Sequence, residues 1–197
     1  MNANKRVRLI ESVFAGAIRA HQQMLAQDSA PILAMAEALA TAFARGGKLL
    51  VFGNGGSAAD AQHLSAELVG RFQRERPGLA AIALSTDTSV LTSVANDYGY
   101  ERLFARQVEA LGQPGDVALG ISTSGSSPNI VAALAAARAR GLTTVALTGR
   151  DGGAAGRHAD VHVNVPESST ARVQEVHRTI LHIVCELIER DLEETKE

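Results

Sequence analysis

Residues 48–71, KLLVFGNGGSAADAQHLSAELVGR, predict a strand, a loop and a helix in succession. The short apolar run at 48–52 predicts a buried strand, because such runs bounded by glycine are typical of strands. The glycine-rich segment 53–57 predicts a tight loop, and residues 58–71 predict a helix. A strand joined to a helix by a short loop begins a β-α-β unit, so this stretch predicts a parallel sheet.

The same alternation continues toward the C-terminus. Further strands are predicted at 79–84, 116–121, 143–147 and 161–165, and helices at 101–111, 128–140 and 170–196. Residues 85–97 form a segment rich in Ser, Thr and Asp, with no helix predicted before Glu101. Short apolar strands that alternate with helices indicate a parallel sheet buried on both faces.

Upstream of the quoted stretch, residues 1–46 predict a helical arm. Apolar residues such as Ile10, Phe14 and Ile18 recur at helical spacing, and a second helix runs from Pro31 through Ala44. We therefore predict a single domain over 1–197, made of an arm at 1–46 and an α/β core at 47–197 that ends in a long helix.

Composition excludes several classes of protein. The chain has 197 residues, of which 46% are hydrophobic and 20% charged, a balance that permits a buried core and argues against disorder. No apolar stretch is long enough to span a membrane. The formal net charge of −2 argues against a nucleic-acid partner. The single cysteine, Cys185, and an N-terminus without signal-peptide features indicate a cytoplasmic protein.

Two loops follow predicted strands, where parallel sheets bind ligands. The first, STSGSS at 122–127, precedes a helix that starts near Pro128. Helix N-termini carry unpaired N–H groups and suit a phosphate, so the hydroxyl-rich loop is a candidate phosphate site; the alternative is a capping turn. The second, GNGGS at 53–57, matches neither a Walker loop nor a dinucleotide fingerprint, which argues against a nucleotide cofactor.

Two pairs of side chains suggest chemistry. His63 and Glu67 are four residues apart on one helix face, as a metal-binding or proton-transfer pair would be, or simply an exposed pair. Gln174 and His182 are eight residues apart on the last helix and differ by about 80° around its axis, so both can face one cavity. A buried core histidine is the alternative for His182. Glu186, Glu189 and Asp191 have no evident chemical role, and Cys185 is predicted to be a packing residue.

Seven motifs form a series that resembles the sugar isomerase (SIS) domain family. They are GNGGSAADAQH (53–63), ELVGRF (67–72), RPGL (76–79), ANDYG (95–99), GISTSG (120–125), LTGRDGG (147–153) and VQEVH (173–177). Within that family, the chain is most similar to the branch that isomerises sedoheptulose 7-phosphate. The resemblance implies a flavodoxin-like five-stranded parallel sheet flanked by helices, with an N-terminal helical arm. It also implies a homotetramer with active sites where subunits meet.

The resemblance assigns roles to residues singled out above and to several others. It implies that Glu67 and His182 are catalytic, as base and acid partner. One Zn²⁺ per subunit, catalytic or structural, would be held by His63, Glu67, Gln174 and His182. The predicted substrate-binding residues are Asn54, Gly55, Gly56, Glu67, Asn96, Asp97, Ser122, Thr123, Ser124, Ser127 and Gln174.

The implied reaction is an aldose–ketose isomerisation, the work of an intramolecular oxidoreductase. It interconverts sedoheptulose 7-phosphate and D-glycero-D-manno-heptose 7-phosphate through an enediol, and leads to nucleotide-activated heptose for lipopolysaccharide core or other surface glycans. The alternative is a non-enzymatic SIS-domain protein that binds the bacterial replication initiator. In that relative the residues that match Glu67 and His182 are replaced, whereas both are present here. A sugar-phosphate-sensing regulator domain fits less well, because no DNA-binding segment is recognised.

Overall fold

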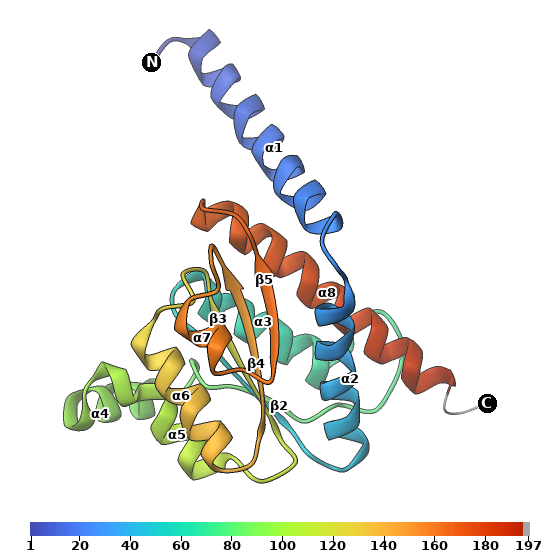
Figure 1. Cartoon of the computed structure of the whole chain (residues 1–197), viewed down its shortest axis with the longest axis vertical. Helices are drawn as coiled ribbons and strands as arrows, with labels where there is room; N and C mark the ends of the chain where they lie inside the picture. The colour runs from blue at the N-terminus through green and yellow to red at the C-terminus, as the bar shows by residue number, and fades with distance from the viewer. Residues whose placement is uncertain (195–197) are drawn as a thin grey trace.

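A parallel sheet organises the computed structural model of the chain, which describes residues 1–194 (Figure 1). The strand order is β2-β1-β3-β4-β5, and every neighbouring pair runs parallel. This is the flavodoxin-like order, and it confirms the expected five-stranded fold. The strands are β1 (Leu49–Gly53), β2 (Ala81–Ala83), β3 (Val117–Ser122), β4 (Thr143–Gly149) and β5 (Val161–Val165).

Helices cover both faces of the sheet and enclose two separate cores. Along β1, Leu49 and Val51 join the core on the side of α2, α3 and α8, whereas Leu50 and Phe52 join the core on the side of α4 to α7. This alternation follows from the strand period of two residues. The helices are α2 (Ala30–Ala44), α3 (Gly56–Val69), α4 (Thr88–Tyr98), the short η1 (Tyr100–Arg102), α5 (Leu103–Leu111), α6 (Pro128–Ala139), α7 (Gly153–Arg157) and α8 (Thr170–Glu194).

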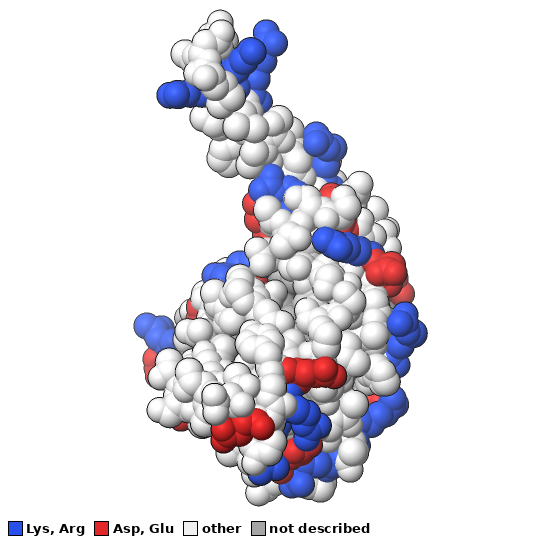
Figure 2. Space-filling model, turned by 90° about the vertical axis from the view of Figure 1, so that its left-hand side faces the viewer, with Lys and Arg blue, Asp and Glu red and all other residues white. Residues whose placement is uncertain are grey.

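Helix α1 (Ala3–Leu25) projects away from the rest of the chain (Figure 1). Its apolar side chains are largely exposed, among them Ile10, Phe14 and Ile18. Near its base, an apolar cavity of about 550 Å³ lies between α1, α2 and α8. Figure 2 shows Lys and Arg side chains gathered toward the free end of this helix. None of the helices among residues 1–194 is long and apolar enough to cross a membrane.

No helix was predicted within residues 85–97, and this prediction is wrong, because α4 covers most of the segment. Asp87 caps this helix, because its Oδ1 accepts hydrogen bonds from the backbone N–H groups of Ser89 and Val90 at 3.0 Å. Val94 is buried in the same core as Leu50 and Phe52 of β1. Helix α7 was also not anticipated. The predicted end of the last helix, Lys196, lies outside the described residues.

Candidate active site

A cavity lies beyond the carboxyl ends of β1 and β3, the two strands at which the sheet order reverses direction. Open parallel sheets bind ligands at such a switch point. The cavity has a volume of about 300 Å³. It is lined by Asn54, Gly55, Gly56, Ser57, Ile121, Ser122, Thr123, Ser127, Thr170 and Gln174.

The serine loop (residues 122–127) forms one wall of this cavity. The Ser122 hydroxyl lies 3.4 Å from that of Ser124 and 3.2 Å from that of Ser127. Gly125 holds the turn with φ +64°, and a side chain there would clash with the Gly152 carbonyl. The three hydroxyls thus converge at the N-terminus of α6, whose first turn contains no acidic residue. This arrangement suits a tetrahedral anion.

A reciprocal amide pair joins the glycine loop to the start of α6. The Nδ2 group of Asn54 donates to Oδ1 of Asn129, and that of Asn129 donates to Oδ1 of Asn54, both at 2.9 Å. The Tyr100 hydroxyl also donates to Oδ1 of Asn54, at 3.0 Å. Sequence reasoning missed Asn129 and Tyr100; the sequence signal for Asn129 is an amide side chain at the start of the predicted helix, directly after the serine loop.

Gln174 belongs to this cavity within one chain. An added Cβ at Gly56 would lie only 2.3 Å from the Gln174 amide nitrogen, so the side chain rests directly on the N-terminus of α3. Glycine is required at this position for that close approach. Asn96 and Asp97, by contrast, are exposed and hydrogen-bonded to each other at 2.8 Å, and they do not line the cavity.

His63, Glu67 and His182 form a second cluster where α3 and α8 lie side by side. The Nε2 atoms of His63 and His182 are 2.8 Å apart, and Glu67 Oε1 lies 3.5 Å from His63 Nε2. The side chains of His63 and Glu67 are about one quarter exposed, so the cluster is open to solvent. Burial, and then the charge of Arg178, lower the pKa of His63. The neutral imidazole is therefore favoured in this position.

The two groups of residues are separated along the helices that carry them. Gln174 and His182 are eight residues apart on α8, which corresponds to about 12 Å along the axis. Within one chain, the structure brings His63, Glu67 and His182 together, and it brings Gln174 to the glycine loop instead. The assignment of all four residues to one metal stays a prediction.

The donor types in the second cluster fit zinc, which binds imidazole nitrogen and carboxylate oxygen. Two nitrogens on a tetrahedral zinc lie about 3.3 Å apart, from Zn–N bonds of about 2.0–2.1 Å. The observed 2.8 Å between His63 and His182 therefore requires a small outward movement of the rings. Among residues 1–194, no group of three His, Cys, Asp or Glu side chains is arranged to hold a metal ion as it stands.

Cys185 takes no part in either group. It lies on the buried face of α8, and burial, followed by the nearby Glu67 and Glu189 carboxylates, raises the pKa of its thiol to about 12. A thiol of this kind is not ionised near neutral pH and is a poor nucleophile. The prediction that Cys185 is a packing residue is confirmed.

Comparison with known proteins identifies the family of the chain. A model of the SIS domain matches residues 14–149. The chain is 62% identical over 161 residues to a phosphoheptose isomerase of Roseiflexus sp. (strain RS-1), covering 82% of each protein. It is 52% identical to a phosphoheptose isomerase of Halorhodospira halophila, covering 98% of this chain and 97% of that protein.

Solved structures give the same result. Phosphoheptose isomerase from Neisseria gonorrhoeae superposes with a TM-score of 0.89 at 45% identity, covering 96% of this chain and all of that chain. The phosphoheptose isomerase from Francisella tularensis superposes with a TM-score of 0.90 at 38% identity, with the same coverage.

Proposed function

The chain belongs to the SIS domain family, and we propose that it interconverts sedoheptulose 7-phosphate and D-glycero-D-manno-heptose 7-phosphate. It is a sugar-phosphate isomerase, as are its relatives at 52–62% identity. The observation that carries the specific proposal is that Glu67 and His182 both lie beside the Nε2 atom of His63, while the hydroxyl-rich serine loop lines a cavity at the N-terminal end of α3.

The reaction moves hydrogen between C1 and C2 of the sugar. In the ketose-to-aldose direction, a base removes a proton from C1 and the C2 carbonyl oxygen gains one, which gives the enediol. A proton then returns to C2 as O1 loses one to become the aldehyde. We assign the carbon-bound proton to the Glu67 carboxylate and the oxygen-bound proton to His182, because carboxylates and imidazoles are the side chains that most often act as general acids and bases.

The serine loop supplies binding energy remote from the reacting carbons. Ser122, Ser124 and Ser127 would donate hydrogen bonds to the phosphate, and the N-terminal N–H groups of α6 add their partial positive charge. Neutral donors suffice at a helix N-terminus. Remote binding of this kind orients the sugar and lowers KM more than it raises kcat.

The proposed cofactor is one Zn²⁺ per subunit, held by His63, Glu67, Gln174 and His182. When bound, it would stabilise negative charge that develops on the sugar oxygens. Because Gln174 and His182 are separated by about 12 Å along α8, the amide in such a site would come from a second copy of the chain. An amide is a weak ligand and suits a position that opens for substrate.

The proposed assembly is a homotetramer. Its support is the projecting α1, whose exposed Ile10, Phe14 and Ile18 would be costly to leave in water, and the apolar cavity at its base. A second copy that packs on these surfaces would also bring its own side chains toward α8. Active sites shared between subunits are consistent with a metal set that one chain does not bring together.

The initiator-binding alternative is not favoured, because Glu67 and His182 are both present and the relatives at 52–62% identity are named as isomerases.

The proposed location of the protein is the cytoplasm, which suits its single thiol, Cys185. The heptose phosphate product would serve the synthesis of nucleotide-activated heptose for lipopolysaccharide core or other surface glycans.

The test is turnover of sedoheptulose 7-phosphate by the purified protein as isolated, after chelation, and after zinc is added back, with metal content measured each time. We expect turnover that is lost on chelation and restored by zinc. Turnover that persists after complete metal removal would keep the isomerase and refute the zinc. A folded protein without turnover in any of these states would refute the isomerase.

A further inference from the structure

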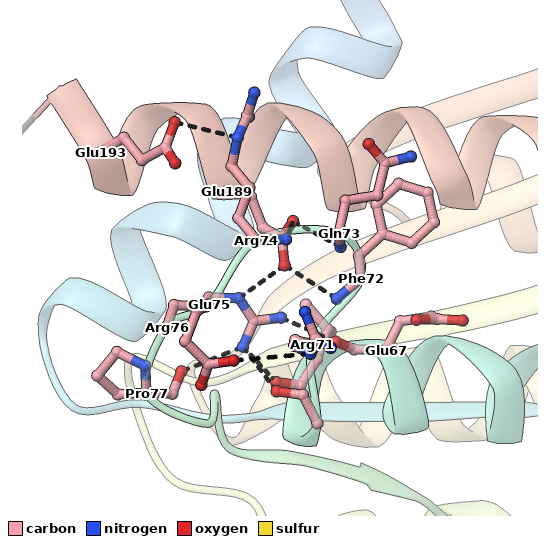
Figure 3. Close-up of polar contacts among 12 residues, drawn as sticks. Glu67, Arg71, Phe72, Gln73, Arg74, Glu75, Arg76, Pro77, Glu189 and Glu193 are labelled. Atoms are coloured by element: carbon pink, nitrogen blue, oxygen red, sulfur yellow. Dashed lines mark hydrogen bonds and ion pairs between the residues drawn. The ribbon is translucent and has the colours of Figure 1, made fainter.

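A buried ion pair links the loop after α3 to the last helix (Figure 3). Arg76 Nε lies 3.2 Å from Glu189 Oε1, and both side chains are at least 97% buried. Glu189 is a residue to which the sequence analysis assigned no chemical role. Two buried charges are expensive to desolvate, and an apolar pair of similar size is often at least as stabilising. The pair therefore calls for an explanation beyond stability.

The Glu189 carboxylate holds the backbone of the loop. It accepts hydrogen bonds at 2.9 Å from the N–H groups of Phe72, Gln73 and Arg74 (Figure 3). Burial alone would raise the pKa of Glu189, but these three donors and the Arg76 charge lower it below its ordinary value. The carboxylate is thus charged and fully engaged at neutral pH.

Arg76 holds the end of α3 in the same way. Its guanidinium donates to the carbonyls of Glu67 and Leu68, both at 2.8 Å, and to that of Pro77 at 3.1 Å. The carbonyls in the last turn of a helix have no partner within the helix, and a cation there is favoured by the helix dipole. Arg76 therefore fixes the turn of α3 that carries Glu67.

Both ends of this network reach the second cluster of the site. Phe72, whose N–H is bound by Glu189, places its ring 5.4 Å from the His182 ring, with the planes tilted by 32°. Glu189 follows His182 by seven residues, so the two lie on the same face of α8, two turns apart. The network thus contacts Glu67 through its backbone and His182 through the Phe72 ring.

We propose that Arg76 and Glu189 are positioning residues, which fix the separation and orientation of Glu67 and His182 for proton transfer. The assignment rests on the proposed function for the roles of those two residues. Neither Arg76 nor Glu189 touches the substrate; they act through the α3 backbone and through Phe72. A shift of about 1 Å at a reacting group can lower the rate about a hundredfold, so the placement of Glu67 and His182 affects kcat directly.

The first experiment compares Glu189→Gln with Glu193→Gln. Glu193 lies one turn farther along α8 and pairs with Arg74 of the same loop, but it is 58% exposed. We expect Glu189→Gln to lower kcat by about tenfold to a hundredfold with KM within about twofold, and Glu193→Gln to leave both unchanged. An unchanged kcat in folded Glu189→Gln, or a rise in KM alone, would overturn the proposal.

A double variant separates positioning from stability. Glu189→Gln alone leaves Arg76 as an unpaired buried charge, which destabilises strongly. Arg76→Gln combined with Glu189→Gln removes both charges, so the melting temperature should return toward that of the wild type while kcat stays low. If kcat recovers together with the melting temperature, the pair acts only through stability and the proposal fails.

A spectroscopic measurement that does not depend on turnover tests the positioning separately from the proposed function. In protein with ¹³C-labelled histidine, the His182 imidazole signal reports the Phe72 ring current, and we expect it to move in Glu189→Gln and in the double variant but not in Glu193→Gln. If the wild type does not turn over sedoheptulose 7-phosphate, the isomerase proposal is wrong, and this spectrum decides the positioning. An unmoved His182 signal in the folded variants would overturn it.

Discussion

Glu67 lies in the last turn of α3 with its carboxylate 3.5 Å from the His63 imidazole, and its replacement is the most direct test at the scale of single residues. Glu67→Gln keeps the size of the side chain but removes the proton acceptor. We expect kcat to fall by at least about a hundredfold, because positioned general bases contribute about 10²–10⁴-fold. The assay is sedoheptulose 7-phosphate isomerisation. Glu75→Gln, an exposed carboxylate nearby, is the control; retained turnover in Glu67→Gln would exclude this base.

Ser124 tests the anion loop. Its hydroxyl lies 3.4 Å from that of Ser122 and accepts from the Ser126 N–H. Ser124→Ala removes one phosphate donor, so we expect KM to rise about fivefold with kcat nearly unchanged, the result of losing about 1 kcal/mol of binding that does not change in the transition state. Steady-state kinetics measure both. Ser93→Ala, an exposed hydroxyl on α4, should change neither, and a fall in kcat at constant KM in Ser124→Ala would contradict the phosphate role.

At this scale, the sequence predicts what lies close along the chain. The pair His63 and Glu67 follows from helical spacing, and the serine loop follows from its place between a strand and a helix. The ion pair of Arg76 and Glu189 joins positions 113 residues apart. Only the packing of α3 beside α8 brings Arg76 and Glu189 together. A charged residue near the end of a long helix is ordinarily exposed, so the position of Glu189 in the sequence does not indicate that it is buried.

Among the elements, α4 depends most clearly on a single cap. Asp87→Ala removes the acceptor for the N–H groups of Ser89 and Val90, and we expect a loss of about 1 kcal/mol in the free energy of unfolding. Urea denaturation measures it. Asp87→Asn should keep most of the stability, because asparagine caps helices about as well as aspartate. Equal losses in both variants would show that the cap is not the source.

The success of element prediction follows the strength of the apolar signal. The strand at 161–165 is predicted with its observed bounds, and the first strand is displaced by one residue. Residues 48–52 are a nearly continuous apolar run, and residues 161–165 alternate Val with polar residues. Helix α4 is missed because its apolar positions, Val90, Leu91 and Val94, are interspersed with Ser and Thr. Those residues favour turns and caps in isolation, and packing against η1 and α5 stabilises the segment as a helix.

For the whole molecule, buried His177 links stability to pH. Burial lowers the pKa of His177, although the Thr148 carbonyl bonded to its Nε2 acts in the opposite direction. Below about pH 6.5, the unfolded chain therefore binds a proton that the folded chain resists, so the free energy of unfolding falls as pH decreases. Melting temperatures between pH 8 and 5 should show this fall. His177→Gln should make this fall smaller, whereas His158→Gln, at an exposed position, should not.

The projecting helix α1 allows a prediction about assembly to be tested. Phe14 lies on the apolar side of α1 and is 67% exposed, so Phe14→Glu should weaken association between copies. Ser12 lies on the opposite side of the helix, so Ser12→Glu should not. Sedimentation velocity over a range of concentrations measures the difference. If the proposed shared sites are correct, activity should fall in Phe14→Glu in parallel with the loss of the tetramer. A tetramer of undiminished stability would place the contact elsewhere.

The position of α8 after all five strands has a consequence for shortened chains. All five strands lie before residue 166, whereas Gln174, His182 and Glu189 lie on the helix that follows them. A chain cut between β5 and α8 would keep all five strands and lose the residues assigned to zinc, to proton transfer and to their positioning. It would also expose the sheet face that α8 covers with side chains such as Val176 and Ile180, so loss of activity and loss of stability would come from the same cut.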